Sequence, residues 1–171
     1  MPFRRLMEVK PVTEKKDVLI SIRPEWCNLI LTGAKELEIR RTRPKIEPPF
    51  KCHIYCTKDK RGGIIGFPKP DGNYIFSNGN VIADFICDKI IDIGVPYPAY
   101  SAQMNKDILK AACMSYSEMH RYAGHNTVYG LHISDLHIFD HSESLDKYGM
   151  KRAPQSWCYV DDADPLRGDQ E

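Results

Sequence analysis

The octapeptide at residues 33–40, GAKELEIR, constrains the fold most, because it places charged residues at fixed spacing directly after a turn glycine. The residues before it, 21–33, predict a strand end and then a short helix that begins near Pro24 and terminates at Gly33. From Lys35 onward, charged and apolar residues alternate, as is typical of a strand. We therefore expect a strand–helix–turn–strand unit that gathers three ionisable side chains near one turn.

The rest of the chain predicts more strands and few helices. Strands are expected at 18–22, 51–57, 81–93, 127–139 and 157–160, and helices at 105–114 and 117–123. Ser117 is the expected N-cap of the last helix, Gly124 its end, and Ser134-Asp135 a candidate bulge. Because strands and helices do not alternate regularly, we predict an α+β fold built on a small barrel or half-barrel.

Residues 58–80 contain five of the eleven glycines and read as a flap or insertion of about residues 59–80. Its apolar pieces, 64–65 and 74–76, predict a β-hairpin. Around this flap we expect one domain at 18–160, an N-terminal arm at 1–17 and an acidic C-terminal tail at 161–171.

Several classes of protein are disfavoured by composition. The apolar runs are much shorter than the roughly 20 residues of a membrane span, and residues 1–16 are too polar for a signal peptide. The six cysteines form no CxxC pair and are expected to be reduced and mostly buried, Cys52 and Cys56 in the core. We expect a cytoplasmic protein without a cofactor, and His132 and His137 do not predict a metal site.

The near-neutral net charge hides an asymmetry. Residues 1–61 hold 15 Lys and Arg against 8 Asp and Glu, whereas residues 62–171 hold 9 against 15. Much of the positive charge lies in Arg40-Arg41-Thr42-Arg43-Pro44-Lys45, directly after the octapeptide. This cluster predicts contact with a polyanion, with a solvated basic face as the alternative interpretation.

The spacing Gly33-x-Lys35-x-x-Glu38-x-Arg40 resembles the GxKxxExR signature of ASCH domains, which belong to the PUA-like superfamily. The segments 21–26, 54–57, 81–85, 132–136 and 154–160 are also similar to small ASCH-type proteins of bacteria and their prophages. The resemblance covers about residues 18–160. It implies a curved PUA-like β-barrel with helices packed at its openings, and a cleft into which the signature side chains project.

The resemblance also implies a ligand class without settling the activity. Related domains bind RNA or hold modified bases, some bacterial members are acetylcytidine amidohydrolases, and others have ribonuclease activity. In the amidohydrolases that this chain resembles, the lysine at the position of Lys35 acts with a threonine three residues on. Here Glu38 occupies that position, which weighs against the same catalytic arrangement.

Strand alternation places Glu36, Glu38 and Arg40 on one face and Lys35 on the other, with Leu37 and Ile39. Only Glu38 and Arg40 are expected to pair. Such a pair can recognise a phosphate or a base edge, while Lys35 adds positive potential. If the protein is a hydrolase, Lys35 and Glu38 are the candidate acid/base residues, provided that burial lowers the pKa of Lys35. The opposing interpretation is a structural ion pair beside a solvated lysine.

We predict a domain that binds RNA or a modified nucleotide or nucleoside, with DNA as an alternative ligand. The candidate nucleic-acid-binding residues are Lys35, Glu38, Arg40, Arg41, Arg43, Lys45, Tyr55 and Trp157. Lys51, Tyr74, Phe76 and Trp26 are further candidates, although for Trp26 core packing is the favoured interpretation. The second function considered is the hydrolase, and the third is a protein-interaction module that uses the 74–76 flap. The oligomeric state is not predicted.

Overall fold

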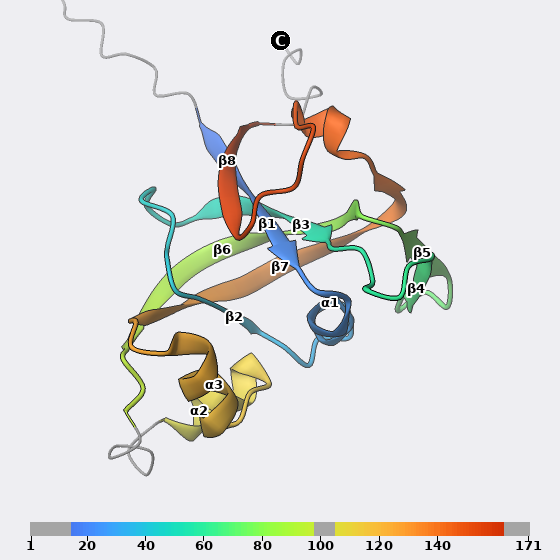
Figure 1. The fold of residues 1–171 in the computed structure, drawn as a ribbon. Coiled ribbons are helices and arrows are strands. Elements are labelled where there is room, and N and C mark those ends of the chain that lie inside the picture. The colour runs from blue at the N-terminus through green and yellow to red at the C-terminus, as the bar shows by residue number, and fades with distance from the viewer. Residues whose placement is uncertain (1–14, 98–104, 163–171) are drawn as a thin grey trace, which may run out of the picture.

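A six-stranded sheet forms the centre of the computed structural model, which describes residues 15–97 and 105–162 (Figure 1). Its strands are β1 (Lys16–Ile22), β2 (Leu37–Arg40), β3 (Phe50–Cys56), β6 (Asn80–Gly94), β7 (Val128–Glu143) and β8 (Trp157–Asp161), in the order β2-β7-β6-β3-β1-β8. The separate hairpin is β4 (Ile65–Pro68) and β5 (Tyr74–Ser77). The helices are α1 (Pro24–Leu31), α2 (Lys106–Ala112), α3 (Tyr116–Ala123) and the 3-10 helix η2 (Leu145–Tyr148).

The predicted α+β class is confirmed, but a closed barrel is not shown. Strands β1 and β3 pair in parallel, and every other pairing of the central sheet is antiparallel. Within the described residues the ladder of backbone pairing ends at β2 on one side and at β8 on the other. The sheet is therefore open in its hydrogen bonding.

Side chains nevertheless connect these two edges. The contacts are Arg40 with Ser156, Thr42 with the indole of Trp157, and the amide of Lys45 with the hydroxyl of Tyr159. We call this line of contacts the β2–β8 seam. It brings the octapeptide and the C-terminal strand together although they are more than a hundred residues apart in the sequence.

Helix α1 follows the predicted pattern. Pro24 lies at its start, where a missing backbone N–H costs nothing, and Gly33 adopts a φ of +79° just beyond its end. Cys27 and Ile30 are buried against the main core. After Gly33 the amide of Lys35 bonds to the carbonyl of Leu29, so the chain turns back before strand β2 begins at Leu37.

Helices α2 and α3 cover a second, smaller core. Their buried residues pack with strands β2 and β7 in a cluster separate from the main one, made of Leu37, Ile39, Ala112, Met119, Ala123 and Val128. The predicted N-cap Ser117 is wrong: the cap is Ser115, whose hydroxyl accepts the amide of Glu118 while the Glu118 carboxylate accepts the amide of Ser115. This reciprocal capping box places the N-cap two residues earlier than predicted, and the helix begins at Tyr116.

Two further predictions are confirmed. The β4–β5 hairpin pairs Gly66 with Phe76 and Pro68 with Tyr74. Asp135 has a φ of +46°, and the β6–β7 register shifts beside it, as expected for a bulge. Lys16 and Asp17, assigned to the arm, belong to β1. Residues 1–14 of the arm and 163–171 of the tail lie outside the described residues.

Candidate functional site

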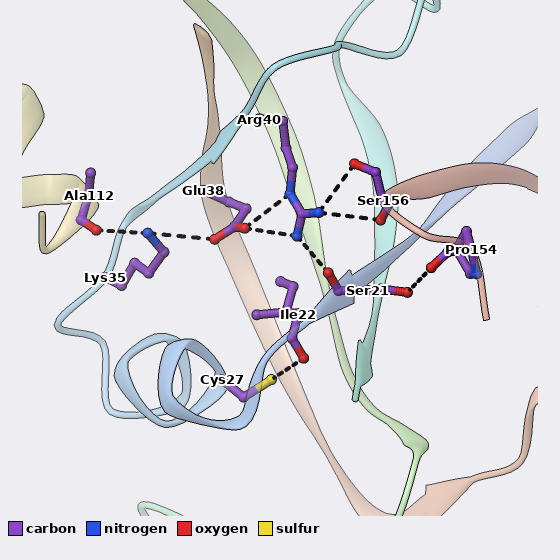
Figure 2. A network of polar contacts seen from close by, with 9 residues as sticks. All are labelled: Ser21, Ile22, Cys27, Lys35, Glu38, Arg40, Ala112, Pro154 and Ser156. Atoms are coloured by element: carbon purple, nitrogen blue, oxygen red, sulfur yellow. Dashed lines mark hydrogen bonds and ion pairs between the residues drawn. The ribbon is translucent and has the colours of Figure 1, made fainter. Parts of the chain in front are cut away.

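Lys35, Glu38 and Arg40 lie next to one another (Figure 2). Glu38 and Arg40 belong to strand β2, and Lys35 lies two residues before the strand begins. Glu38 Oε1 accepts hydrogen bonds from Arg40 Nε at 3.1 Å and Nη2 at 2.9 Å. Glu38 Oε2 lies 3.6 Å from Lys35 Nζ. The three residues are only 3%, 6% and 8% exposed, so the octapeptide forms a buried charge cluster.

The predicted Glu38–Arg40 pair is confirmed, whereas the prediction that Lys35 lies on the opposite face is wrong. Alternation along a strand applies only to extended residues, and β2 begins at Leu37, two residues after Lys35. Lys35 lies in the turn that follows α1, and from there its side chain reaches Glu38. The interpretation of a solvated lysine is also wrong, because Lys35 is buried.

Arg40 is occupied by protein partners. Besides its two bonds to Glu38, Nη2 donates to the carbonyl of Ser21 at 2.7 Å. Nη1 makes longer contacts, 3.4 Å to the carbonyl and 3.3 Å to the hydroxyl of Ser156. The guanidinium group therefore orients Glu38 and ties β1, β2 and the residue before β8 together, which differs from a direct role on a phosphate.

Glu38 has one carboxylate oxygen that accepts hydrogen bonds and one buried oxygen that accepts none in the described part of the chain. Oε1 is held by Arg40, but Oε2 is buried and has no hydrogen-bond partner in the described part of the chain. Its neighbour is Lys35 Nζ at ion-pair distance. A buried carboxylate oxygen without a hydrogen bond is costly, so this atom keeps an unused capacity to accept one, and Lys35 is the charged group nearest to it.

Lys35 is held from three sides. Nζ donates to the carbonyl of Ala112 at the end of α2 at 2.7 Å, and it lies 4.8 Å from the centroid of the Trp26 ring. Burial lowers the pKa of Lys35, and the nearby Glu38 carboxylate opposes part of that decrease. An amine with a lowered pKa is easier to use as a base than an exposed lysine.

A cavity of about 580 Å³ opens beside this cluster. Its volume falls within the range of about 300–1,000 Å³ that is usual for small-molecule sites. Aromatic walls come from Trp26 on α1 and Tyr122 on α3, and two further arginines, Arg23 and Arg41, line it. Four hydroxyl groups also lie along its walls, from Ser21, Thr42, Thr57 and Ser156.

Sequence comparison and structure comparison give different answers. Neither a scan against protein-family models nor a search of curated proteins finds a match. The structure of ASCH from Zymomonas mobilis superimposes with a TM-score of 0.59 at 20% identity, covering 84% of this chain and 87% of that chain. A serine-to-alanine variant of that protein gives 0.61 at 18% identity, with 88% and 92% covered. A tyrosine-to-phenylalanine variant gives 0.60 at 18% identity, with 87% and 93% covered.

This chain has an ASCH-domain fold. The similarity extends over most of both chains, as the resemblance of the sequence segments implied. In this ASCH fold the octapeptide lies at the cavity: Lys35, Glu38, Ile39 and Arg40 all line it.

The ASCH fold brings only some of the predicted binding residues to the cavity. Arg41 lines it, and its guanidinium lies 5.5 Å from the Tyr122 ring. Arg43 and Lys45 lie outside its lining, on the segment that leaves β2. Tyr55 is only 7% exposed and packs in the main core, so its predicted role in stacking a base is not supported. Trp157 lies at the seam, where its indole donates to Thr42 Oγ1.

Reasoning from the sequence did not assign Arg23 or Tyr122 to the cavity, and it favoured a core role for Trp26. Trp26 was expected in the core, and it does contact the core, but it also lines the cavity. Arg23 directly precedes α1, and Tyr122 comes from α3, more than 80 residues after the octapeptide. For Trp26 the available signal was a tryptophan in the first turn of α1, a few residues before the turn at Gly33 that reverses the chain.

The site contains no group suited to a metal ion in the part of the chain that the structure describes. His132 hydrogen-bonds to Asp88 at 2.6 Å, whereas His137 lies 3.8 Å from a different carboxylate, that of Asp84. As predicted, Cys52 and Cys56 are buried in the core. No helix among the described residues is long and apolar enough to cross a membrane.

Proposed function

We propose that the cavity binds a base of RNA or a modified nucleoside. The observation that carries this proposal is the buried Glu38 oxygen that lacks a hydrogen bond, beside the Lys35 amine, in two residues that line the cavity. Together they offer an acceptor next to a donor, which complements an edge of a nucleobase that presents a donor next to an acceptor. Arg40 supports the proposal by fixing the orientation of Glu38.

The cavity walls support the same ligand class. Trp26 and Tyr122 provide aromatic surface against which a flat ring can pack. Arg23 and Arg41 are exposed members of the lining and supply positive charge for a ribose phosphate. The basic residues Arg43 and Lys45, outside the cavity, extend this charge along the protein surface for a longer RNA.

Binding and chemistry are separated by incubating the purified protein with a panel of modified nucleosides and short RNAs, then following both retention and mass change. We expect Glu38→Gln to weaken nucleoside binding about tenfold to a hundredfold, because a hydrogen bond to a charged group is lost. Glu36→Gln is the matched control, since Glu36 is an exposed neighbour outside the cavity lining. Equal affinity of both variants and of the wild-type protein would contradict the proposal.

RNA binding makes a further demand. Arg43→Ala should weaken binding of an oligonucleotide in a salt-dependent manner, because it removes a charge that meets phosphates. The same change should leave nucleoside binding unaltered, since Arg43 does not line the cavity. An affinity that does not depend on salt in any variant would exclude the phosphate contacts.

A hydrolase is the second candidate, favoured by one specific observation. Burial lowers the pKa of Lys35, and this amine shares the cavity wall with Glu38 and with hydroxyl groups that include Thr57. In this case Lys35 and Glu38 act as the acid/base pair on a modified nucleoside or on RNA. Product formation that disappears in Lys35→Ala, at undiminished substrate affinity, would establish this activity.

We further propose that the open sheet and the β2–β8 seam together form the PUA-like half-barrel that the sequence resemblance implies. A bacterial or prophage origin, a cytoplasmic location and the absence of a cofactor stay predictions. DNA is tested as the alternative ligand in the same binding panel.

A further inference from the structure

The β4–β5 hairpin has one buried face and one exposed aromatic face. Phe67 and Ile75 point into the main core and are 3% and 1% exposed. Tyr74 and Phe76, which alternate with Ile75, are 57% and 58% exposed. The inner face already anchors the hairpin, so the two outer rings are not needed to complete the core.

The exposed rings lie nearly parallel to each other. Their centroids are 6.2 Å apart and their planes are inclined by only 23°. Gly66 lies opposite Phe76, and a Cβ atom on that glycine would come within 2.9 Å of the ring. Because Gly66 has no side chain, the Phe76 ring can pack against the backbone of strand β4. We call Tyr74 and Phe76 the aromatic ledge.

The ledge is held in place rather than carried on a free loop. Lys69, between the two strands, forms ion pairs with Asp140 of β7 at 3.1 Å and with Asp71 at 3.4 Å. Together with the buried inner face, these contacts fix the hairpin beside β7. A pre-organised aromatic surface loses little conformational entropy when a ligand stacks on it.

The chain that connects the cavity to the hairpin is positively charged. Thr57 lines the cavity, and β4 begins only eight residues later at Ile65. Between them lie Lys58, Lys60 and Arg61, all exposed, against one acidic residue that pairs with Arg61. A polyanion that leaves the cavity toward the hairpin would meet cations first and aromatic rings next.

We infer that the aromatic ledge stacks bases of a single-stranded nucleic acid whose recognised base occupies the cavity. This inference rests on the proposed function, because it assigns the ledge to the same ligand. Stacking on aromatic side chains beside basic residues is how sequence-tolerant binding of single strands is achieved. A protein partner is less well matched, since a stable interface needs about 800 Å² on each side and the ledge consists of two rings that follow a positively charged segment.

The test measures affinity for a single-stranded RNA of about 12 nucleotides, within the range of about 4–16 nucleotides for single-strand-binding domains. A Tyr74→Leu/Phe76→Leu double variant keeps apolar side chains but removes the rings, and it should bind this RNA about tenfold or more weakly. A Tyr74→Phe/Phe76→Tyr double variant keeps both rings and should bind like the wild-type protein. Nucleoside binding in the cavity should be unaltered in both.

Each outcome decides between the two proposals. Unchanged RNA affinity of the leucine double variant, with weakened binding by Glu38→Gln, overturns the ledge and leaves the cavity proposal intact. Weakened RNA binding by the leucine variant alone, with Glu38→Gln unaffected, supports the ledge and overturns the cavity. Self-association in sedimentation that is lost in the leucine variant, at unchanged RNA affinity, also overturns the ledge and identifies a protein interface.

Discussion

Replacing Arg40 with alanine is expected to destabilise the fold, in addition to any effect on a ligand. The guanidinium group makes two bonds to Glu38, one to the carbonyl of Ser21 and two longer contacts to Ser156. Arg40→Ala removes all of them and leaves the buried Glu38 carboxylate without its principal partner. It also cuts the contact by which the residue before β8 is joined to β2.

The size of the effect follows from this burial. Breaking a buried ion pair by removing one partner costs about 3–5 kcal/mol, because the remaining charge is left uncompensated. For a domain of this size, each kcal/mol lowers Tm by about 2–4 °C, so the expected decrease in Tm is about 6–20 °C. Arg41→Ala is the matched control: its guanidinium is exposed and lies 5.5 Å from the Tyr122 ring, so its removal should cost less than about 1 kcal/mol.

Urea and thermal denaturation of both variants measure this difference. If the stranded carboxylate causes the loss, adding Glu38→Gln to Arg40→Ala should restore part of the stability, which a double-mutant cycle would detect. Equal unfolding midpoints for Arg40→Ala and Arg41→Ala would refute the reasoning, because they would show that the buried network contributes no more than an exposed arginine.

Three further predictions concern Lys35, Gly130 and the start of α3. Because the pKa of Lys35 is lowered on folding, the unfolded chain binds more protons at this site between that lowered pKa and about 10.4, so stability should rise with pH through that window. Urea midpoints measured between about pH 7 and about pH 10, in steps of about one pH unit, should show this rise in the wild-type protein. The rise should be lost in Lys35→Met. Gly130→Ala should cost about 1–3 kcal/mol by chemical denaturation, since the new Cβ would lie 2.8 Å from Leu37 side-chain atoms, and a neutral result would contradict the tight packing of β2 on β7. Ser115→Ala should lose about 0.5–2 kcal/mol of stability. Ser117→Ala should change stability by less than about 0.5 kcal/mol, and the reverse order would reject the cap.

The strands were predictable where apolar residues alternate over a long run. The long strands β6 and β7 and the β4–β5 hairpin lie close to the expected ranges, because their patterns depend on local chemistry alone. The Glu38–Arg40 pair followed from the same period-two rule. The sequence resemblance supplied the ASCH fold, which the solved structures confirm.

The cavity was less predictable because it is assembled from distant segments. Lys35 was assigned to the wrong face, since the first residue of a strand cannot be located from alternation when a turn precedes it. Tyr122 reaches the cavity from α3, and Ser156 reaches Arg40 from the segment before β8. Neither contact leaves a local signal in the sequence, because both depend on how the edges of the sheet and the two helices pack.

The separate core beneath α2 and α3 has a consequence for access to the cavity. This helical pair contributes Met114 and Tyr122 to the cavity wall, and it is held partly by the Lys35 bond to the carbonyl of Ala112. Among the residues that the structure describes, its buried cluster has six members, compared with 22 in the main core. Because regions with less buried apolar contact open at lower free energy, backbone amides of α2 and α3 should exchange with deuterium before those of β1 and β3. The wall of the cavity would thus open as a local unit while the central sheet stays folded.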